Sequence, residues 1–282
     1  MGAGTLNPPD VRTSAITAAR TTTPRVIRSE WVKLRTLRST WLTIGGMLFA
    51  LTAFGLISAL TASGQVDATA GQGRPPGFIG TDPVSTVLAG ATFAVLIVAV
   101  LGAIIGAREY STGMIRTTLA AVPKRLPVLW GQLTTFVALV APVALVGVLV
   151  SFFGGMAILD AGGAATVAWS DDGVAGAVLG MAAYLVGLGV IGLALGILLR
   201  STAGGIGTVL GAVLFVPTLA SALLPDSWDD ILKYLPSNAG QAFTSLNPSD
   251  TLLSAGVGMV VFAAWVLLAI VGAAVALKRR DA

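Results

Sequence analysis

Six long intervals without a single charged residue divide this chain. They cover residues 39–66, 83–107, 126–159, 173–199, 201–225 and 251–277, and each is at least 25 residues long. A helix of about 20 residues crosses the hydrocarbon core of a bilayer. Lipid offers backbone groups no hydrogen-bond partners, and the intervals lack the alternation of barrel strands, so we expect helices. The sequence therefore predicts an all-α integral membrane protein with six transmembrane helices, near 41–62, 84–107, 128–153, 174–199, 203–224 and 251–277.

Composition excludes a soluble particle and most kinds of catalysis. The chain is 55% hydrophobic and 11% charged, whereas soluble domains carry about 25% charged residues. Cysteine and histidine are both absent, which removes disulfides, thiolate and imidazole metal ligands, a cysteine nucleophile and a histidine base. No acid/base pair and no lysine lies within an apolar interval. We therefore expect no enzyme, no bound metal and no cofactor in this chain.

The loops indicate how the spans are oriented. With the N-terminus inside, 15 of the 17 lysines and arginines face the cytoplasm, and only Arg74 and Lys233 lie outside. Positive residues concentrate on the cytoplasmic side of membrane proteins. We therefore expect both termini to be cytoplasmic. The net charge of +4 then reflects topology and attraction to anionic lipid, and does not indicate a nucleic-acid partner.

Two different patterns precede the first span. Residues 1–24 are polar and rich in Ala, Thr and Pro, and we expect a disordered cytoplasmic tail. Beyond them, Ile27, Trp31 and Leu34 recur at helical spacing among basic residues. This spacing predicts an amphipathic helix on the cytoplasmic leaflet, which serves either as an anchor or as a signalling element.

The longest cytoplasmic connection between spans is the loop 108–127. Ile115, Leu119 and Val122 fall on one helical face, and Pro123 stops the helix. We expect a short surface helix between the second and third spans, stiff enough to transmit a push.

The fifth span and the loop after it are irregular. Pro217 interrupts the span, and Pro225 ends it. The run Ser227-Trp228-Asp229-Asp230 has a capping-box pattern that predicts a short helix at 231–235, and Ser237-Asn238 could cap another at 239–246. We expect either two short external helices that re-enter the membrane or an ordinary external loop. Irregular backbone at membrane depth survives only against protein or water.

Small residues are spaced for close contact between helices. The pairs are Gly102 and Gly106, Gly176 and Gly180, Gly192 and Gly196, and Gly207 and Gly211. Glycines four residues apart let helix backbones approach closely. We expect these pairs to pack within the bundle.

The chain lacks its own means of driving transport. No ionisable residue lies in an expected span, whereas ion-coupled carriers usually keep one there. The phosphate-binding pattern GxxxxGK[ST] is also absent. If the protein moves a substrate uphill, a partner protein must supply the energy.

The layout over residues 24–282 resembles the permeases of ABC transporters of the type-two export class, which have the type V exporter fold. The most specific stretch is Arg108-Glu109-Tyr110-Ser-Thr-Gly113-Met-Ile-Arg116. It is similar to the Glu-Tyr-x-x-Gly-x-x-Arg run between the second and third spans of G-subfamily multidrug half-transporters. Residues 28–38 resemble the N-terminal connecting helix of bacterial drug and antibiotic self-resistance permeases. The chain has no fused ATPase domain and only a short external loop without cysteines, which favours a separate-subunit bacterial arrangement.

The resemblance implies the transmembrane subunit of an ATP-driven exporter in the bacterial cytoplasmic membrane, with residues 25–282 as its permease domain. Two ABC ATPase subunits and a second permease copy, identical or related, are the implied partners, together with membrane lipid. ATP and Mg²⁺ are then used by the ATPase and not by this chain. The absence of charge at membrane depth favours a hydrophobic or amphipathic cargo, such as a drug, an antibiotic or a lipid-like molecule.

The resemblance also assigns roles to individual residues. The residues expected to couple the chain to the ATPase are Glu109, Tyr110, Gly113 and Arg116, and those expected on the connecting helix are Glu30, Trp31, Lys33 and Arg35. We expect Glu109 and Arg116 to form charge pairs that hold the ATPase contact or the connecting helix. The candidates for the substrate pathway are Phe93, Phe215 and Pro217.

Two other readings remain open at the level of sequence. The chain could be a scaffold or sensor that recruits a cytoplasmic partner through the same basic helix and loop. It could also be a permease of this fold that serves sodium extrusion, lipid flipping or metal-site maturation. The proline-broken fifth span favours a transport pathway, because a scaffold has no need of irregular backbone.

Overall fold

The computed structural model describes residues 22–65, 82–115, 117–118, 125–247 and 251–279, and within these ranges the chain forms helices and loops only. The long helices are α2 (Arg38–Ala62), α4 (Ala91–Ser111), α6 (Leu126–Ala161), α7 (Val174–Leu199) and α12 (Ala255–Arg279). Shorter ones are α1 (Thr23–Thr36), α3 (Pro83–Val87), α8 (Thr202–Leu210), α9 (Val216–Leu223), α10 (Asp229–Leu232) and α11 (Pro236–Thr244), with the π-helix η2 (Gly211–Phe215) and the 3₁₀ turn η3 (Asp226–Trp228). Helix α1 begins at Thr23, just inside the segment expected to be a tail.

Six of these helical stretches are long and apolar enough to cross a membrane, which confirms the predicted fold class. The fifth is the composite of α8, η2 and the start of α9, over Thr202–Ala220. Helix α6, with 36 residues, continues well past the expected end at residue 153. The chain is therefore a polytopic membrane protein.

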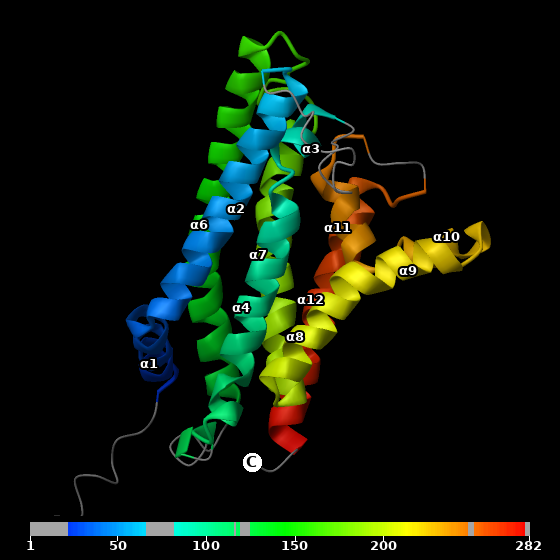
Figure 1. Cartoon of the computed structure of the whole chain (residues 1–282). Helices are drawn as coiled ribbons and strands as arrows, with labels where there is room; N and C mark the ends of the chain where they lie inside the picture. The colour runs from blue at the N-terminus through cyan, green and yellow to red at the C-terminus, as the bar shows by residue number, and fades with distance from the viewer. Residues whose placement is uncertain (1–21, 66–81, 116, 119–124, 248–250, 280–282) are drawn as a thin grey trace, which may run out of the picture.

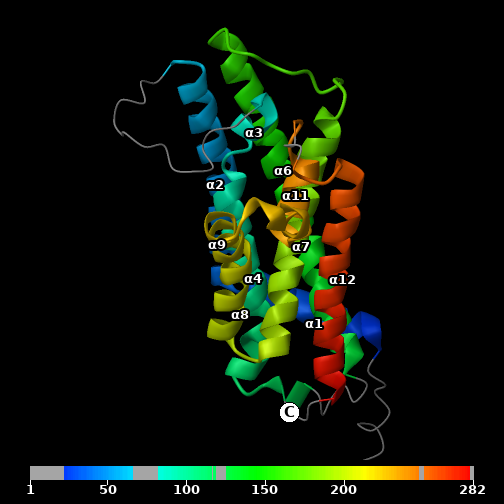
Figure 2. The same cartoon turned by 90° about the vertical axis from the view of Figure 1, so that its right-hand side faces the viewer.

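Both ends of the described chain lie at the same end of the bundle (Figure 1). This end, which we call the basic end, carries α1, the last turn of α4, the first turn of α6 and the last turn of α12 (Figures 1 and 2). Its described lysines and arginines are Arg25, Arg28, Lys33, Arg35, Arg38, Arg108, Arg125, Arg200, Lys278 and Arg279. The only other described lysine or arginine is Lys233.

Helices α4 and α7 form the centre of the bundle and approach each other at glycines. A Cβ added to Gly102 or Gly106 of α4 would overlap a backbone carbonyl of α7, and one added to Gly192 or Gly196 of α7 would overlap a carbonyl of α4. This contact confirms the packing predicted for those two pairs. The prediction is wrong for Gly176, Gly207 and Gly211, because a Cβ at these positions would meet open space.

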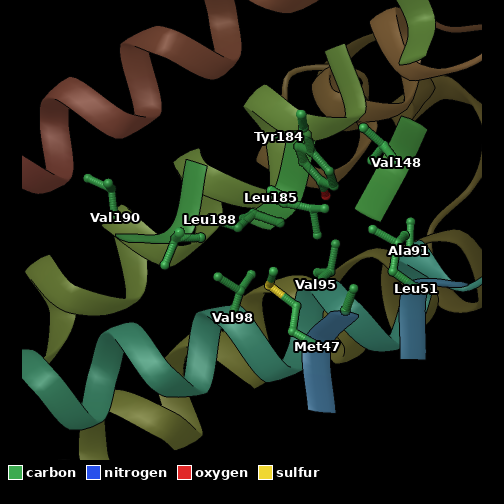
Figure 3. Packing of buried hydrophobic residues seen from close by; sticks show 14 of the residues in the cluster. Met47, Leu51, Ala91, Val95, Val98, Val148, Tyr184, Leu185, Leu188 and Val190 are labelled. Carbon is green, nitrogen blue, oxygen red and sulfur yellow. The ribbon is translucent and has the colours of Figure 1, made fainter. Parts of the chain in front are cut away.

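Apolar side chains from four helices fill the space around this contact. Met47 and Leu51 of α2 meet Val95 and Val98 of α4, and Leu185 of α7 lies against them (Figure 3). Leu51, Val98 and Leu185 have no exposed surface. The four-helix core fixes the position of α4, whose last turn reaches the basic end.

The second span starts with a short capped helix. At α3, the Asp82 carboxylate accepts a hydrogen bond from the Ser85 amide at 2.8 Å, and the Ser85 hydroxyl reaches back to the Asp82 amide, which is a capping box. The Ser151 hydroxyl of α6 donates to the Val87 carbonyl at 2.6 Å, which satisfies a group left free by the end of α3. Helix α4 then begins at Ala91.

The fifth span leaves the bundle halfway along its length. Helix α8 packs against α4 and α7, and η2 follows as a π-helical segment directly before Pro217. Proline has no amide hydrogen and cannot continue the regular hydrogen-bond ladder, so a break at this position is expected. Helices α9 and α10 project sideways from the bundle (Figure 1). We call residues 216–235 the lateral arm.

The lateral arm returns to the bundle beside α12. Trp265 of α12 donates its indole hydrogen to the Tyr234 carbonyl at 2.8 Å, and Asn238 donates to the Leu232 carbonyl at 2.9 Å. Helix α11 then packs against α12 and α7, with Ala239, Ala242 and Phe243 buried (Figure 2). Helix α11 is thus a short helix folded back against two membrane spans.

The details of this loop differ from the sequence prediction. Ser227 lies inside η3 and forms no capping box. The first short helix is α10, which begins two residues before the expected range 231–235 and ends at Leu232. Helix α10 is exposed and does not fold back against the spans. The second helix starts at Pro236, because proline is favoured in the first helical turn, so Asn238 is not its cap.

Candidate functional site

Helix α1 packs against α6 through a face that includes a carboxylate. Pro24 lies in its first turn, and Val26, Glu30 and Leu34 are buried at intervals of four residues. The sequence predicted a stripe of Ile27, Trp31 and Leu34 that faces the membrane. Trp31 is 38% exposed and free to face lipid, whereas Leu34 is buried in the protein. Glu30 lies on the buried face, in the protein interior.

Glu30 belongs to a cluster of three charges that joins α1 to α4. The Lys33 ammonium Nζ lies 2.6 Å from Glu30 Oε1 and 2.7 Å from Glu109 Oε1. Both glutamates are only 6% exposed. Glu109 stands in the last turn of α4, so the cluster fastens the surface helix α1 to the end of the second span. We call Glu30, Lys33 and Glu109 the ion-pair cluster.

The cluster places two carboxylates around one ammonium. Burial raises the pKa of Glu30 above its usual range, although the hydrogen bond and the positive charge of Lys33 oppose this rise. Burial also disfavours the charged form of Lys33, but its bonds to Glu109 and Glu30 outweigh this effect and raise the pKa of Lys33. The ammonium is therefore the component that holds both acids in place.

One carboxylate oxygen of the cluster is left for another donor. Among the described residues, Glu109 Oε2 is buried without a hydrogen-bond partner. A cavity of about 70 Å³ lies beside the cluster, lined among others by Arg108, Thr112 and Gln132. A cavity of this size can hold water, which would satisfy the oxygen.

Tyr110 connects the same turn of α4 to the start of the fifth span. The Arg200 guanidinium carbon lies 5.2 Å from the centre of the Tyr110 ring, in cation–π geometry. Arg200 occupies the turn between α7 and α8 with φ of 52°. At the same end, Arg125 donates to the Leu277 carbonyl at 3.0 Å and so ties α6 to α12. The end of α4 is thus in contact with both α1 and the α7–α8 turn.

The chain turns sharply directly after this site. Gly113 has φ of +72°, a left-handed conformation that other residues rarely adopt, and its amide donates to the Tyr110 carbonyl at 3.2 Å. Glycine is therefore required for the turn that ends α4. Met114, the next residue, is 50% exposed.

Part of the predicted coupling element lies outside the described residues. Arg116 and residues 119–124, including Leu119 and Val122, belong to this part. The described remainder, Ile115, Thr117 and Thr118, is helical, and Ile115 is buried.

The predicted site residues fall into two groups. The structure brings Glu30, Lys33 and Glu109 together, with Lys33 as the partner of Glu109 on α1. Tyr110 follows Glu109 in the chain but contacts Arg200. Arg35 and Trp31 are exposed and lie outside the cluster. The contacts of Arg200 and Arg125 were not predicted. Arg200 is the single charge between two apolar intervals of the sequence, and this isolation could have marked it.

The three residues expected along a substrate pathway have different surroundings. The Phe93 ring packs on Phe54 with centroids 4.5 Å apart, and Phe215 in η2 is 61% exposed. Pro217 alone lines a cavity, of about 580 Å³, at the end of the bundle opposite the basic end. The structure does not join these residues into one site.

Comparison with protein-family models gives no match for this chain, and a search of curated proteins finds no significantly similar sequence.

Proposed function

We propose that the chain is the transmembrane subunit of an ATP-driven exporter, powered by a separate ATPase. The observation that carries the proposal is the ion-pair cluster, which fastens the surface helix α1 to the end of the second span. A membrane protein that only anchors a helix needs no buried charge to do so, because apolar contact is sufficient. A buried charged link is favoured where a surface element must move together with a span.

The basic end is the cytoplasmic end in this proposal. Ten of the eleven lysines and arginines among the described residues lie at that end, which agrees with the positive-inside bias. The ATPase docks there, against α1 and the turn that follows Gly113. Met114 offers it an exposed apolar side chain beside the rigid turn.

Movement would pass from this surface into the membrane through α4. Glu109 and Tyr110 are neighbours in its last turn, and they contact α1 and the α7–α8 turn respectively. Farther along, α4 packs on α7 through backbone contacts at Gly102 and Gly106, which leave little room for independent motion. A push at the basic end therefore displaces α4, α7 and α8 together.

The proposal includes a second copy of the chain or a related permease. In the fifth span, only 11% of the 18-residue apolar stretch is buried within the chain, compared with 67% of the corresponding stretch of α7. The lateral arm returns at Trp265, ten residues into α12, about 15 Å along the helix from its first residue. The arm carries Asp229, Asp230 and Lys233, and charges at such depth require protein or water around them. A second copy would enclose the arm and provide that environment.

The cargo is a hydrophobic or amphipathic molecule. No charged residue occurs in any of the six apolar intervals, so a charged solute would find no counter-ion along the spans outside the lateral arm. A drug, an antibiotic or a lipid-like molecule fits this lining.

Purification of the tagged chain from its native membranes tests the proposal. We expect an ATPase with a phosphate-binding loop to co-purify in mild detergent, and the eluate to hydrolyse ATP. Glu109→Ala removes one of the two carboxylates and leaves a neutral Glu30–Lys33 pair, so the variant should fold and insert. Its cluster no longer joins α1 to α4, and export and coupled hydrolysis should fall to background.

Asp172→Ala, an exposed change in the loop between α6 and α7 at the opposite end, is the matched control and should behave as wild type. A folded wild-type protein without any co-purifying ATPase would contradict the proposal and favour a scaffold or sensor. A Glu109→Ala variant that exports normally would remove Glu109 from the coupling mechanism.

A further inference from the structure

A cavity at the end of the bundle opposite the basic end lies within a single copy of the chain. It has a volume of about 580 Å³ and is lined by residues of α3, α4, the first half of α7, η2 and α11. Ligand pockets of proteins usually measure about 300–1,000 Å³. The cavity is therefore large enough for a drug-sized molecule, and it forms without a second subunit.

One wall of this cavity is a polar stripe on α11. Ser237, Asn238, Gln241, Thr244 and Ser245 all line it, and their spacing places them on one face of the helix. The opposite face holds Ala239, Ala242 and Phe243 and packs on α7 and α12. Polar side chains on helices in a membrane bundle usually face an interior site or a water-filled cavity. The stripe thus gives the cavity a hydrogen-bonding wall.

Side chains on this wall retain unused hydrogen-bonding capacity. Among the described residues, the Ser237 hydroxyl oxygen is buried without a partner. Asn238 donates one amide hydrogen to the Leu232 carbonyl, while its side chain also lines the cavity. Buried polar atoms cost free energy unless they are bonded, so the cavity favours an occupant that bonds them.

The facing wall is apolar, and among the residues that the structure describes the lining contains no charged one. Val95, Leu96, Met181, Val213 and Leu214 contribute to this apolar side. The Tyr184 ring, which packs edge-to-face near Phe243, lies where the two walls meet. An ionised ligand would lose hydration here and gain no counter-ion.

We propose that this cavity is a binding site for an uncharged amphipathic molecule that carries carbonyl, amide or hydroxyl groups along one edge. The polar edge binds the α11 stripe, and the apolar body packs against α4, α7 and η2. The site concerns binding within one chain, so it stands or falls independently of an ATPase partner.

The absence of cysteine from the chain makes the site directly testable. Gln241→Cys places a single thiol on the polar wall, and Asp172→Cys places one on the outer surface at the same end of the bundle. The purified variants, in lipid nanodiscs, are reacted with N-ethylmaleimide. The neutral probes are Nile red, progesterone and colchicine, and ethidium is the cationic probe.

At least one neutral probe is expected to slow labelling of Gln241→Cys saturably and by about tenfold, as occupancy at ten times the Kd requires. Labelling of Asp172→Cys should not change, and ethidium should protect neither thiol. Ser237→Ala combined with Thr244→Val removes two hydrogen-bonding groups from the polar wall. The double change should raise the Kd of the protecting probe by about fivefold to tenfold.

A second thiol, on another wall of the cavity, tests whether protection of Gln241→Cys reflects occupancy of the cavity or only a local effect at position 241. Thr92→Cys lies on α4 across the same cavity and should be protected by the same probe. Equal protection by ethidium, or no saturable protection of either cavity thiol by any neutral probe, would overturn the proposal. Loss of ATPase co-purification alone would not affect it.

Discussion

Replacement of Lys33 by methionine should destabilise the protein more than any other single change in the ion-pair cluster. The substitution leaves Glu30 and Glu109, both almost fully buried, without their shared ammonium. Removal of one partner from a buried ion pair typically costs about 3–5 kcal/mol. The Lys33 side chain is one-third exposed, so we expect a loss of about 2–4 kcal/mol in the free energy of unfolding.

The expected loss can be measured by thermal unfolding of the purified variants in detergent, and by protease access to α1. Arg35→Met is the matched control, because Arg35 lies on the same helix but is exposed and outside the cluster. It should change stability by no more than about 0.5 kcal/mol.

A charge swap separates the role of the cluster from the role of lysine itself. Lys33→Glu combined with Glu109→Lys restores two carboxylates around one ammonium, now carried by α4. The double variant should recover most of the stability that Lys33→Met loses. If Lys33→Met is as stable as Arg35→Met, the cluster does not hold α1 to α4, and the mechanical link in the proposed function is wrong.

Gly192→Leu should prevent the bundle from forming correctly. Gly192 of α7 lies against the Ala99 carbonyl of α4, so a side chain there would push the two central helices apart. Overpacking usually costs about 1–3 kcal/mol when side chains can adjust. A backbone carbonyl has less freedom, and we expect more than about 3 kcal/mol, seen as low yield and aggregation in size-exclusion chromatography.

Gly176→Leu provides a close control in the same helix. A Cβ at Gly176 meets nothing within 4 Å, and the substitution improves helix propensity by up to about 1 kcal/mol. Gly176→Leu should therefore be as stable as wild type or slightly more stable. Equal yields and melting temperatures for the two variants would show that α4 and α7 are not in backbone contact at Gly192.

The architecture was readable from sequence because membrane insertion depends on local composition. A charge-free interval of sufficient length determines a span without reference to the rest of the fold, and all six intervals became helical spans. Termini of elements were less predictable. Helix α6 extends to Ala161, past the expected end at 153, because it continues beyond the length that a bilayer core requires.

The candidate site was predictable only in part. Sequence placed Glu109 near the connecting helix by resemblance, and Lys33 was among the residues expected on that helix. Which of them contacts Glu109 depended on the face that α1 packs on α6, and the sequence alone does not show that face. The 580 Å³ cavity could not be predicted, because its lining comes from several separate segments spread between Ser85 and Leu252.

The most direct test of the account asks whether an ATPase touches the turn after α4. Met114→Cys and Asp172→Cys each introduce a single thiol into a cysteine-free chain, at the basic end and at the opposite end respectively. Each variant is labelled with a benzophenone maleimide in native membranes and illuminated. We expect Met114→Cys to form an adduct with a protein that carries an ATP-binding phosphate loop, and Asp172→Cys to form none. Full labelling of Met114→Cys without such an adduct would contradict it.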